Sequence, residues 1–170
     1  DVAQDLCASG AEVTMVQRGP RLLMAEDEEV SARFTELAGR RHRLLLNSAV
    51  VAVRAHTGHA IHLARDGSVM GTGGNRFGPL SHHGLGDKAD RWGPIFRGAV
   101  AIATGSRHSL AIRADGSLWA WGEGFAIEPA KIMEHVRAVA AGDTATIAIA
   151  EDGALWQWDS GGKPRSVAWP

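Results

Sequence analysis

The chain has 170 residues, a formal net charge of −1 at neutral pH, 45% hydrophobic residues and 22% charged residues. This composition is that of a globular protein. It lacks the basic excess of domains that bind nucleic acid or anionic membranes, so we expect neither as a partner. No apolar stretch is long enough to cross a bilayer. Cys7 is the single cysteine, which excludes an internal disulfide and predicts a reducing, cytoplasmic environment.

Residues 1–48 alternate between helical and strand patterns, and they begin in mid-pattern without an initiating Met, which predicts a fragment of a longer protein. We expect helices over residues 1–8 and 26–39 and strands over residues 12–16 and 43–47. The second helix opens with four acidic residues, which suits the positive end of the helix dipole. Its helical spacing predicts one apolar stripe, formed by Val30, Phe34, Leu37 and Ala38.

The stretch from Gly10 to Leu23 resembles a strand and turn in the nucleotide-binding domain of the flavin-dependent pyridine nucleotide-disulfide oxidoreductases. In that family the residue closing this strand meets the adenosine ribose, and Gln17 and Arg18 occupy that place here. The resemblance therefore implies an NAD(P) cofactor held by Gln17 and Arg18. The Gly-rich turn that holds the pyrophosphate in such domains is expected before Asp1. The alternative is that residues 1–48 hold a degenerate first copy of a repeat that recurs in the rest of the chain.

Three Asp-Gly turns, each followed by an apolar strand, organise the rest of the chain. Their glycines, Gly67, Gly116 and Gly153, follow one another at intervals of 49 and 37 residues. Asp-Gly is a strong hairpin signal because Gly adopts positive φ without steric cost. Corresponding short strands precede each turn, and none of the units contains a helical pattern. Such a period, with several short strands in each unit, is typical of propeller blades.

The stretch from Gly105 to Gly122 closely resembles the regulator of chromosome condensation repeat, and the loop from Gly73 to Leu80 resembles the segment after the last strand of that repeat. The resemblance covers residues 49–170 and implies a mainly β fold, a partial β-propeller of about three blades, preceded by a short α/β segment. Family members close seven blades into a ring, so open blade faces and self-association through them are expected. Three positions depart from the pattern: Ala145 replaces a His, Thr72 replaces a Trp, and the last repeat ends in Trp158-Asp159 in place of Trp-Gly.

Histidines are the first residues to weigh as ligands. His56, His59 and His62 lie close together in sequence, but alternation along a strand turns His59 away from the other two, so we expect no metal site. His108 recurs at the position of His59, which indicates an architectural role. The longer first interval between turns predicts a long loop, and loops on a rigid scaffold often carry recognition. The partner-binding residues predicted there are His82, His83, Asp87, Lys88, Arg91 and Trp92.

The sequence offers no set of residues arranged for catalysis. No Ser has a His and an acid at a spacing that indicates a nucleophile. The tryptophans at 119, 121, 156 and 158 are expected to pack between blades. The favoured interpretation is therefore a non-enzymatic repeat module that binds a protein partner through its loops and needs no cofactor. The alternative is a fragment of a pyridine nucleotide-disulfide oxidoreductase that binds NAD(P).

Overall fold

The structure is a computed structural model that describes residues 14–46, 49–81, 87–159 and 161–168. The chain divides into two compact units, Asp1–Val50 and Val51–Pro170. The predicted helix over residues 1–8 lies outside the described residues. None of the helices in the described ranges is both long enough and apolar enough to span a membrane.

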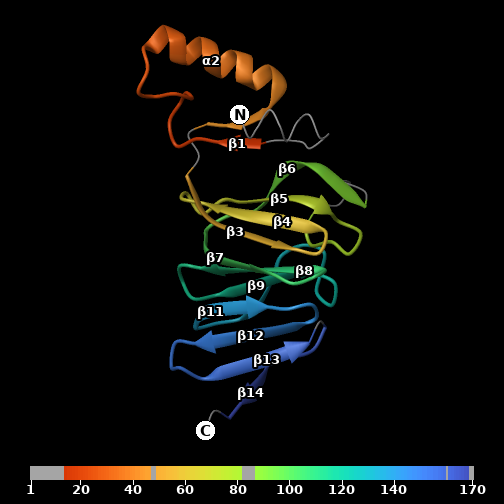
Figure 1. Cartoon of the computed structure of the whole chain (residues 1–170). Helices are drawn as coiled ribbons and strands as arrows, with labels where there is room; N and C mark the ends of the chain where they lie inside the picture. The colour runs from red at the N-terminus through yellow and green to blue at the C-terminus, as the bar shows by residue number, and fades with distance from the viewer. Residues whose placement is uncertain (1–13, 47–48, 82–86, 160, 169–170) are drawn as a thin grey trace. The chain divides into compact units, whose positions relative to one another are not determined.

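The first unit has a β-α-β arrangement (Figure 1). Strand β1 (Thr14–Val16) pairs in parallel with β2 (Arg43–Leu45), and helix α2 (Glu28–Arg41) lies between them in sequence. The carboxylate of Asp27 caps α2, accepting hydrogen bonds from the amides of Glu29 and Val30 at 2.9 and 3.5 Å. Residues 22–24, which the alternative interpretation would place in a hairpin with residues 13–16, contain a bend at Leu22 and a turn at Met24 and no strand.

Helix α2 turns a polar side toward the preceding turn. The Ser31 hydroxyl donates to the Leu22 carbonyl at 2.5 Å, and the Leu22 amide donates to the Thr35 hydroxyl at 2.8 Å. Ser31 and Ala38 are the buried residues of the helix. Because the turn packs against this side, the large residues of the predicted apolar stripe lie on the exposed side, with exposures of 56% for Val30, 42% for Phe34 and 44% for Leu37. Of the residues in the predicted stripe, Ala38 alone is buried.

The second unit consists of three four-stranded antiparallel sheets that follow one another along the chain (Figure 1). The first sheet contains β3 (Val50–His56), β4 (His59–Ala64), β5 (Val69–Gly74) and β6 (Lys88–Phe96). The second contains β7 (Ala99–Thr104), β8 (His108–Arg113), β9 (Leu118–Gly122) and β10 (Ala130–Met133). The third contains β11 (Val136–Ala141), β12 (Ala145–Ala150), β13 (Leu155–Asp159) and β14 (Arg165–Val167).

Two apolar cores lie between successive sheets. Ile61 of the first sheet and Trp121 of the second belong to one core, and Leu110 of the second sheet and Trp158 of the third belong to the other. Side chains alternate along a strand, so the middle sheet contributes to both cores. This arrangement agrees with the prediction that the tryptophans pack between blades.

Each Asp-Gly turn has the same local geometry. The carboxylates of Asp66, Asp115 and Asp152 each accept a hydrogen bond at 2.9 Å from the amide two residues later. The turns also connect neighbouring sheets, because the Gly67 carbonyl accepts from the Ala99 amide at 3.0 Å and the Gly116 carbonyl accepts from the Val136 amide at 2.9 Å. The turn motif that marks the repeat in the sequence is thus also a joint between repeats.

The segment expected to be a long loop is partly a strand. Residues 88–96 form β6, which pairs with β5 through Gly73–Ala89 and Gly74–Lys88. The sequence gives little sign of this strand, because charged residues dominate its first half. Its pairing with β5 is also irregular, since the register shifts at two points. An outer strand of a sheet tolerates such residues because one of its edges is unpaired.

Candidate functional site

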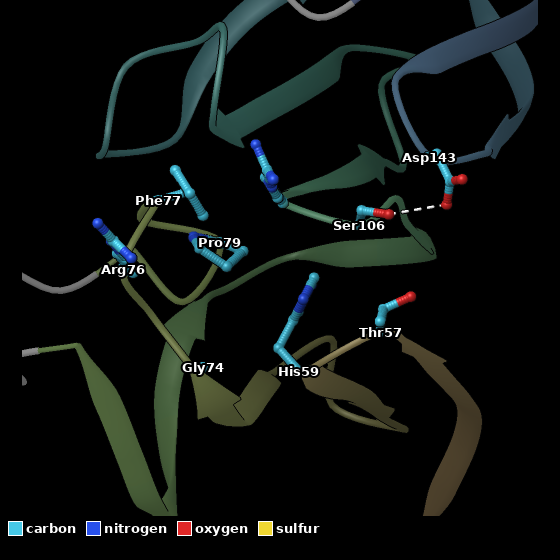
Figure 2. A pocket seen from close by; sticks show the side chains of 10 residues that line it. Thr57, His59, Gly74, Arg76, Phe77, Pro79, Ser106 and Asp143 are labelled. Carbon is cyan, nitrogen blue, oxygen red and sulfur yellow. Dashed lines mark hydrogen bonds between the residues drawn. The ribbon is translucent and has the colours of Figure 1, made fainter.

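Four loops from all three sheets meet at one end of the second unit and enclose a hollow of about 460 Å³ (Figure 2). They are the β3–β4, β7–β8 and β11–β12 turns and the segment that comes after β5. We call this space the loop hollow, and its lining residues are Thr57, Gly58, His59, Gly74, Arg76, Phe77, Pro79, Ser106, Arg107 and Asp143.

A glycine fixes how the segment after β5 enters the hollow. Gly73 has φ +103°, and a Cβ there would lie 2.4 Å from the Gly58 carbonyl oxygen and 2.9 Å from the Cα of His59. Only glycine fits so close to another backbone. The Gly74 amide then donates to the Gly58 carbonyl at 2.6 Å. The same device recurs at Gly122, so the repeat itself specifies this entry.

The exposed side chains that line the hollow include two arginines and one phenylalanine. The guanidinium carbon of Arg107 lies 4.3 Å from the centre of the Phe77 ring, and that of Arg76 lies 5.8 Å from it. Both distances are within the range of cation–π attraction. Phe77 keeps 38% of its surface exposed. In Figure 2, Arg76, Phe77 and Pro79 lie together, away from Ser106 and Asp143.

Ser106, His56 and Asp143 form a polar cluster that joins the three sheets at the edge of the hollow. The Ser106 hydroxyl donates to the Asp143 carboxylate at 2.8 Å and lies 3.3 Å from Nδ1 of His56. Nε2 of His56 lies 3.2 Å from the same carboxylate oxygen. A nucleophilic serine needs a histidine that accepts its proton, whereas this hydroxyl donates to the acid. The cluster therefore connects the turns and is not arranged as a catalytic triad.

Buried histidines pair with hydroxyl groups across both interfaces. Nε2 of His59 lies 3.1 Å from the Ser109 hydroxyl, and Nε2 of His108 lies 3.0 Å from the Thr146 hydroxyl. Burial is the main cause that lowers the pKa of His59 to about 4, and the nearby His108 and His56 lower it further. Burial also lowers the pKa of His108. Both imidazoles are thus neutral near pH 7, as hydrogen-bonded architectural residues would be.

The third of the clustered histidines lies apart from the hollow. His62 is on the opposite face of β4 from His59, and its ring centre is 4.8 Å from that of Trp92. The described part of the chain contains no group of three His, Cys, Asp or Glu residues that could hold a metal ion.

The predicted partner-binding residues that the structure describes lie outside the loop hollow. Lys88 forms an ion pair with Asp90 at 2.6 Å. Asp87 and Arg91 are exposed. His82 and His83 lie outside the described residues.

In the first unit, Gln17 donates through its side-chain amide to the Arg21 carbonyl at 3.2 Å, and Arg18 is exposed. A role for this pair in cofactor binding stays a prediction. The residues of the loop hollow that the sequence reasoning missed are Arg76, Phe77 and Arg107. One available signal was the arginine–aromatic pair Arg76-Phe77, placed between a glycine turn and Pro79.

Comparison with known proteins agrees with the two resemblances. Residues 99–125 match the family described as regulator of chromosome condensation (RCC1) repeat, and residues 1–67 match the family described as pyridine nucleotide-disulphide oxidoreductase. The second match extends through β3 and β4 of the first sheet. The ultraviolet-B receptor UVR8 of Arabidopsis thaliana is 31% identical in an alignment of 91 residues that covers 49% of this chain and 20% of UVR8.

Solved structures show the same fold. Human WBSCR16 has a TM-score of 0.64 at 15% identity, over 72% of this chain and 40% of that one. Yeast RCC1 (Prp20) bound to Kap60 has a TM-score of 0.58 at 21% identity, over 66% of this chain and 30% of that one. The chain thus spans less than half of each of these relatives. The predicted resemblance to the RCC1 repeat family and the mainly β fold of about three blades are confirmed.

Proposed function

We propose that the second unit is a non-enzymatic interaction module that binds a protein partner at the loop hollow. The observation that carries this proposal is the meeting of loops from three sheets around an exposed aromatic ring and two arginines, Phe77, Arg76 and Arg107. Aromatic and arginine side chains are the residue types enriched at the centres of protein interfaces. Yeast RCC1 (Prp20), which has a similar fold, was solved in complex with the protein Kap60.

The test compares which proteins are captured by the whole chain and by two variants of it. Phe77→Ala removes the exposed ring of the loop hollow, while Arg65→Ala alters an exposed residue in the β4–β5 turn outside it. Each captured protein is then purified and its affinity for the chain is measured by calorimetry. We expect a partner whose binding is weakened at least tenfold by Phe77→Ala and is unchanged by Arg65→Ala. Equal binding to both variants would contradict the proposal.

We also propose that copies of the chain associate through the open face of the third sheet. Ile147 is 41% exposed, whereas its counterparts Ile61 and Leu110 in the preceding sheets are 0% exposed because the next sheet covers them. Exposed apolar faces of this kind favour association. Sedimentation velocity should show a concentration-dependent dimer or larger assembly that Ile147→Lys dissociates. A monomer at all concentrations would refute this second surface.

The alternative of NAD(P) binding by Gln17 and Arg18 stays a proposal for the first unit, supported by the family match over residues 1–67 and by the parallel β1–α2–β2 arrangement. Calorimetric titration of the whole chain with NADPH tests it, with Arg18→Ala as the variant. Heat that is lost in the variant would favour the alternative, and the absence of heat would remove it.

A further inference from the structure

We infer that the loop hollow binds an acidic peptide segment, in which an aspartate or glutamate carboxylate meets Arg76 and Arg107 while a neighbouring apolar side chain lies against Phe77. This inference rests on the proposed function and adds the chemistry of the partner to it. Three features of the hollow carry it: its available positive charge, its exposed ring and the rigidity of the segment that presents them.

The positive charge of the hollow is only partly compensated. The exposed Arg76 forms no ion pair with any residue that the structure describes. Arg107 contacts both oxygens of Glu123, at 3.0 and 3.3 Å, through the single nitrogen Nη1. A guanidinium has five N–H donors in a planar fork, so a carboxylate can approach Arg107 by its other nitrogens.

The negative charge at the opposite edge is already engaged. Asp143 accepts from the Ser106 hydroxyl at 2.8 Å, and its carboxylate lies 3.2 Å from Nε2 of His56. These contacts leave its negative charge in place, but Figure 2 shows Asp143 at the edge of the hollow away from Arg76 and Phe77. Glu123 and Asp143 do, however, set a limit on the total negative charge that the hollow accepts. This favours one or two carboxylates over a polyanion such as a nucleic acid, in agreement with the net charge of −1.

The Phe77 ring supplies an apolar surface beside this charge. It is 38% exposed and flanked by the guanidinium carbons of Arg107 and Arg76 at 4.3 and 5.8 Å. The ring thereby restrains both cations near one position before a ligand arrives. An apolar side chain adjacent to the ligand carboxylate would cover the remaining exposed surface of the ring.

The segment that carries Arg76 and Phe77 is fixed by hydrogen bonds on both sides. The Asn75 amide donates to the Asp87 carbonyl at 2.7 Å, and the Asn75 side-chain oxygen accepts from the Leu80 amide at 3.1 Å. The Gly78 amide donates to the Asn75 carbonyl at 2.9 Å. Such preorganisation reduces the entropy lost on binding and suits recognition of a short peptide.

The test is selection of random dodecapeptides displayed on phage against the whole chain, with counter-selection on Arg76→Glu. We expect the retained peptides to be enriched at least twofold in Asp and Glu next to an apolar residue. Each should bind Arg76→Glu at least tenfold more weakly, and Arg76→Lys less weakly than that, because Lys keeps the charge but loses the planar fork. Arg65→Glu, at a position outside the hollow, is the matched control and should change affinity by less than twofold.

Two results would overturn the inference: peptides without acidic enrichment, or no peptide that depends on Arg76. An Arg76-dependent affinity for a single-stranded oligonucleotide in place of peptides would overturn it as well. The proposed function is tested separately by the protein whose binding depends on Phe77. If that protein binds through the hollow but no acidic peptide does, the acidic chemistry is wrong and the module function stands.

Discussion

The two interfaces between successive sheets share two kinds of joint, and one of their differences lies at a tryptophan. Each interface has a histidine–hydroxyl pair and a glycine carbonyl that accepts an amide from the next sheet. At the first interface, Nε1 of Trp121 also donates to the Pro79 carbonyl at 2.7 Å. The equivalent Nε1 of Trp158 at the second interface is buried and has no hydrogen-bond partner among the described residues.

The difference arises from the loops that precede each interface. The long segment after β5 brings the Pro79 carbonyl to Trp121 of the second sheet, whereas the segment after β9 is shorter and supplies no carbonyl to Trp158. A buried N–H without a partner costs free energy that a paired N–H does not. We therefore expect the third sheet to be held less firmly than the second, although both carry the same repeat motif.

The largest effects are expected from truncating the apolar residues that each interface buries. Ile61 and Leu110 hold equivalent places in the two interfaces, and each is 0% exposed. Replacing either by Ala should lower the free energy of unfolding by about 3 kcal/mol, because transfer and cavity costs add. Urea unfolding followed by tryptophan fluorescence measures this loss.

Ile147→Ala is the matched control, since Ile147 occupies the same repeat position on the uncovered face and is 41% exposed. At protein concentrations where the chain is monomeric, a loss below about 1 kcal/mol is expected for it, as for substitutions outside a packed core. A loss as large as that of Leu110→Ala would mean that this face is covered in solution, which would favour the proposed self-association.

The sequence predicted the repeat well because its signals are local. Asp-Gly turns, alternating apolar strands and recurring tryptophans each depend on the geometry of a few neighbouring residues. It could not predict the loop hollow, because Arg76, Arg107 and Asp143 come from three sheets and meet only in the fold. Sequence spacing also missed β6, where pairing with β5 outweighs the low strand propensity of charged residues.

A second prediction concerns the loss of folding stability in acid. The pKa of His59 is about 4 in the folded chain, compared with the usual 6.5, so below pH 6.5 the unfolded chain binds a proton that the folded chain does not. Stability is therefore nearly unaffected above about pH 7.5 and falls as the pH decreases toward 4. His59 alone should remove about 2 kcal/mol between about pH 7.5 and pH 5. His108 acts in the same direction, because its pKa is also lowered.

Unfolding free energies measured at half-unit pH steps check this dependence. His59→Gln should flatten the decline between pH 6.5 and pH 5, because the unfolded chain of this variant no longer gains that proton. An unaltered slope in His59→Gln would show that protonation of this interface does not control the acid response.

A third prediction compares two Asp-Gly turns, one packed against a neighbouring sheet and one open. Gly67 and Gly153 have φ values of +80° and +88°, so Ala costs about 1 kcal/mol of backbone strain at either position. A Cβ on Gly67 would also lie 3.1 Å from the Cα of Gly98 and 3.2 Å from the Ala99 carbonyl oxygen, whereas one on Gly153 meets nothing within 4 Å. Gly67→Ala should therefore destabilise by about 1 kcal/mol more than Gly153→Ala. Equal losses of stability in thermal unfolding would mean that the backbone around Gly67 shifts to make room for the Cβ at no cost in free energy.

The smallest effect isolates the hydrogen bond from Trp121 to Pro79, which has no counterpart at Trp158 among the described residues. Trp121→Phe and Trp158→Phe remove similar volumes from the two cores, so their cavity costs are comparable. Trp121→Phe also leaves the Pro79 carbonyl without its donor, while Trp158→Phe removes an N–H that has no described partner. The first variant should therefore lose about 1 kcal/mol more than the second in urea unfolding. If Trp158→Phe lost as much, a hydrogen-bond acceptor for Trp158 would have to exist in solution, and the two interfaces would be equivalent in strength.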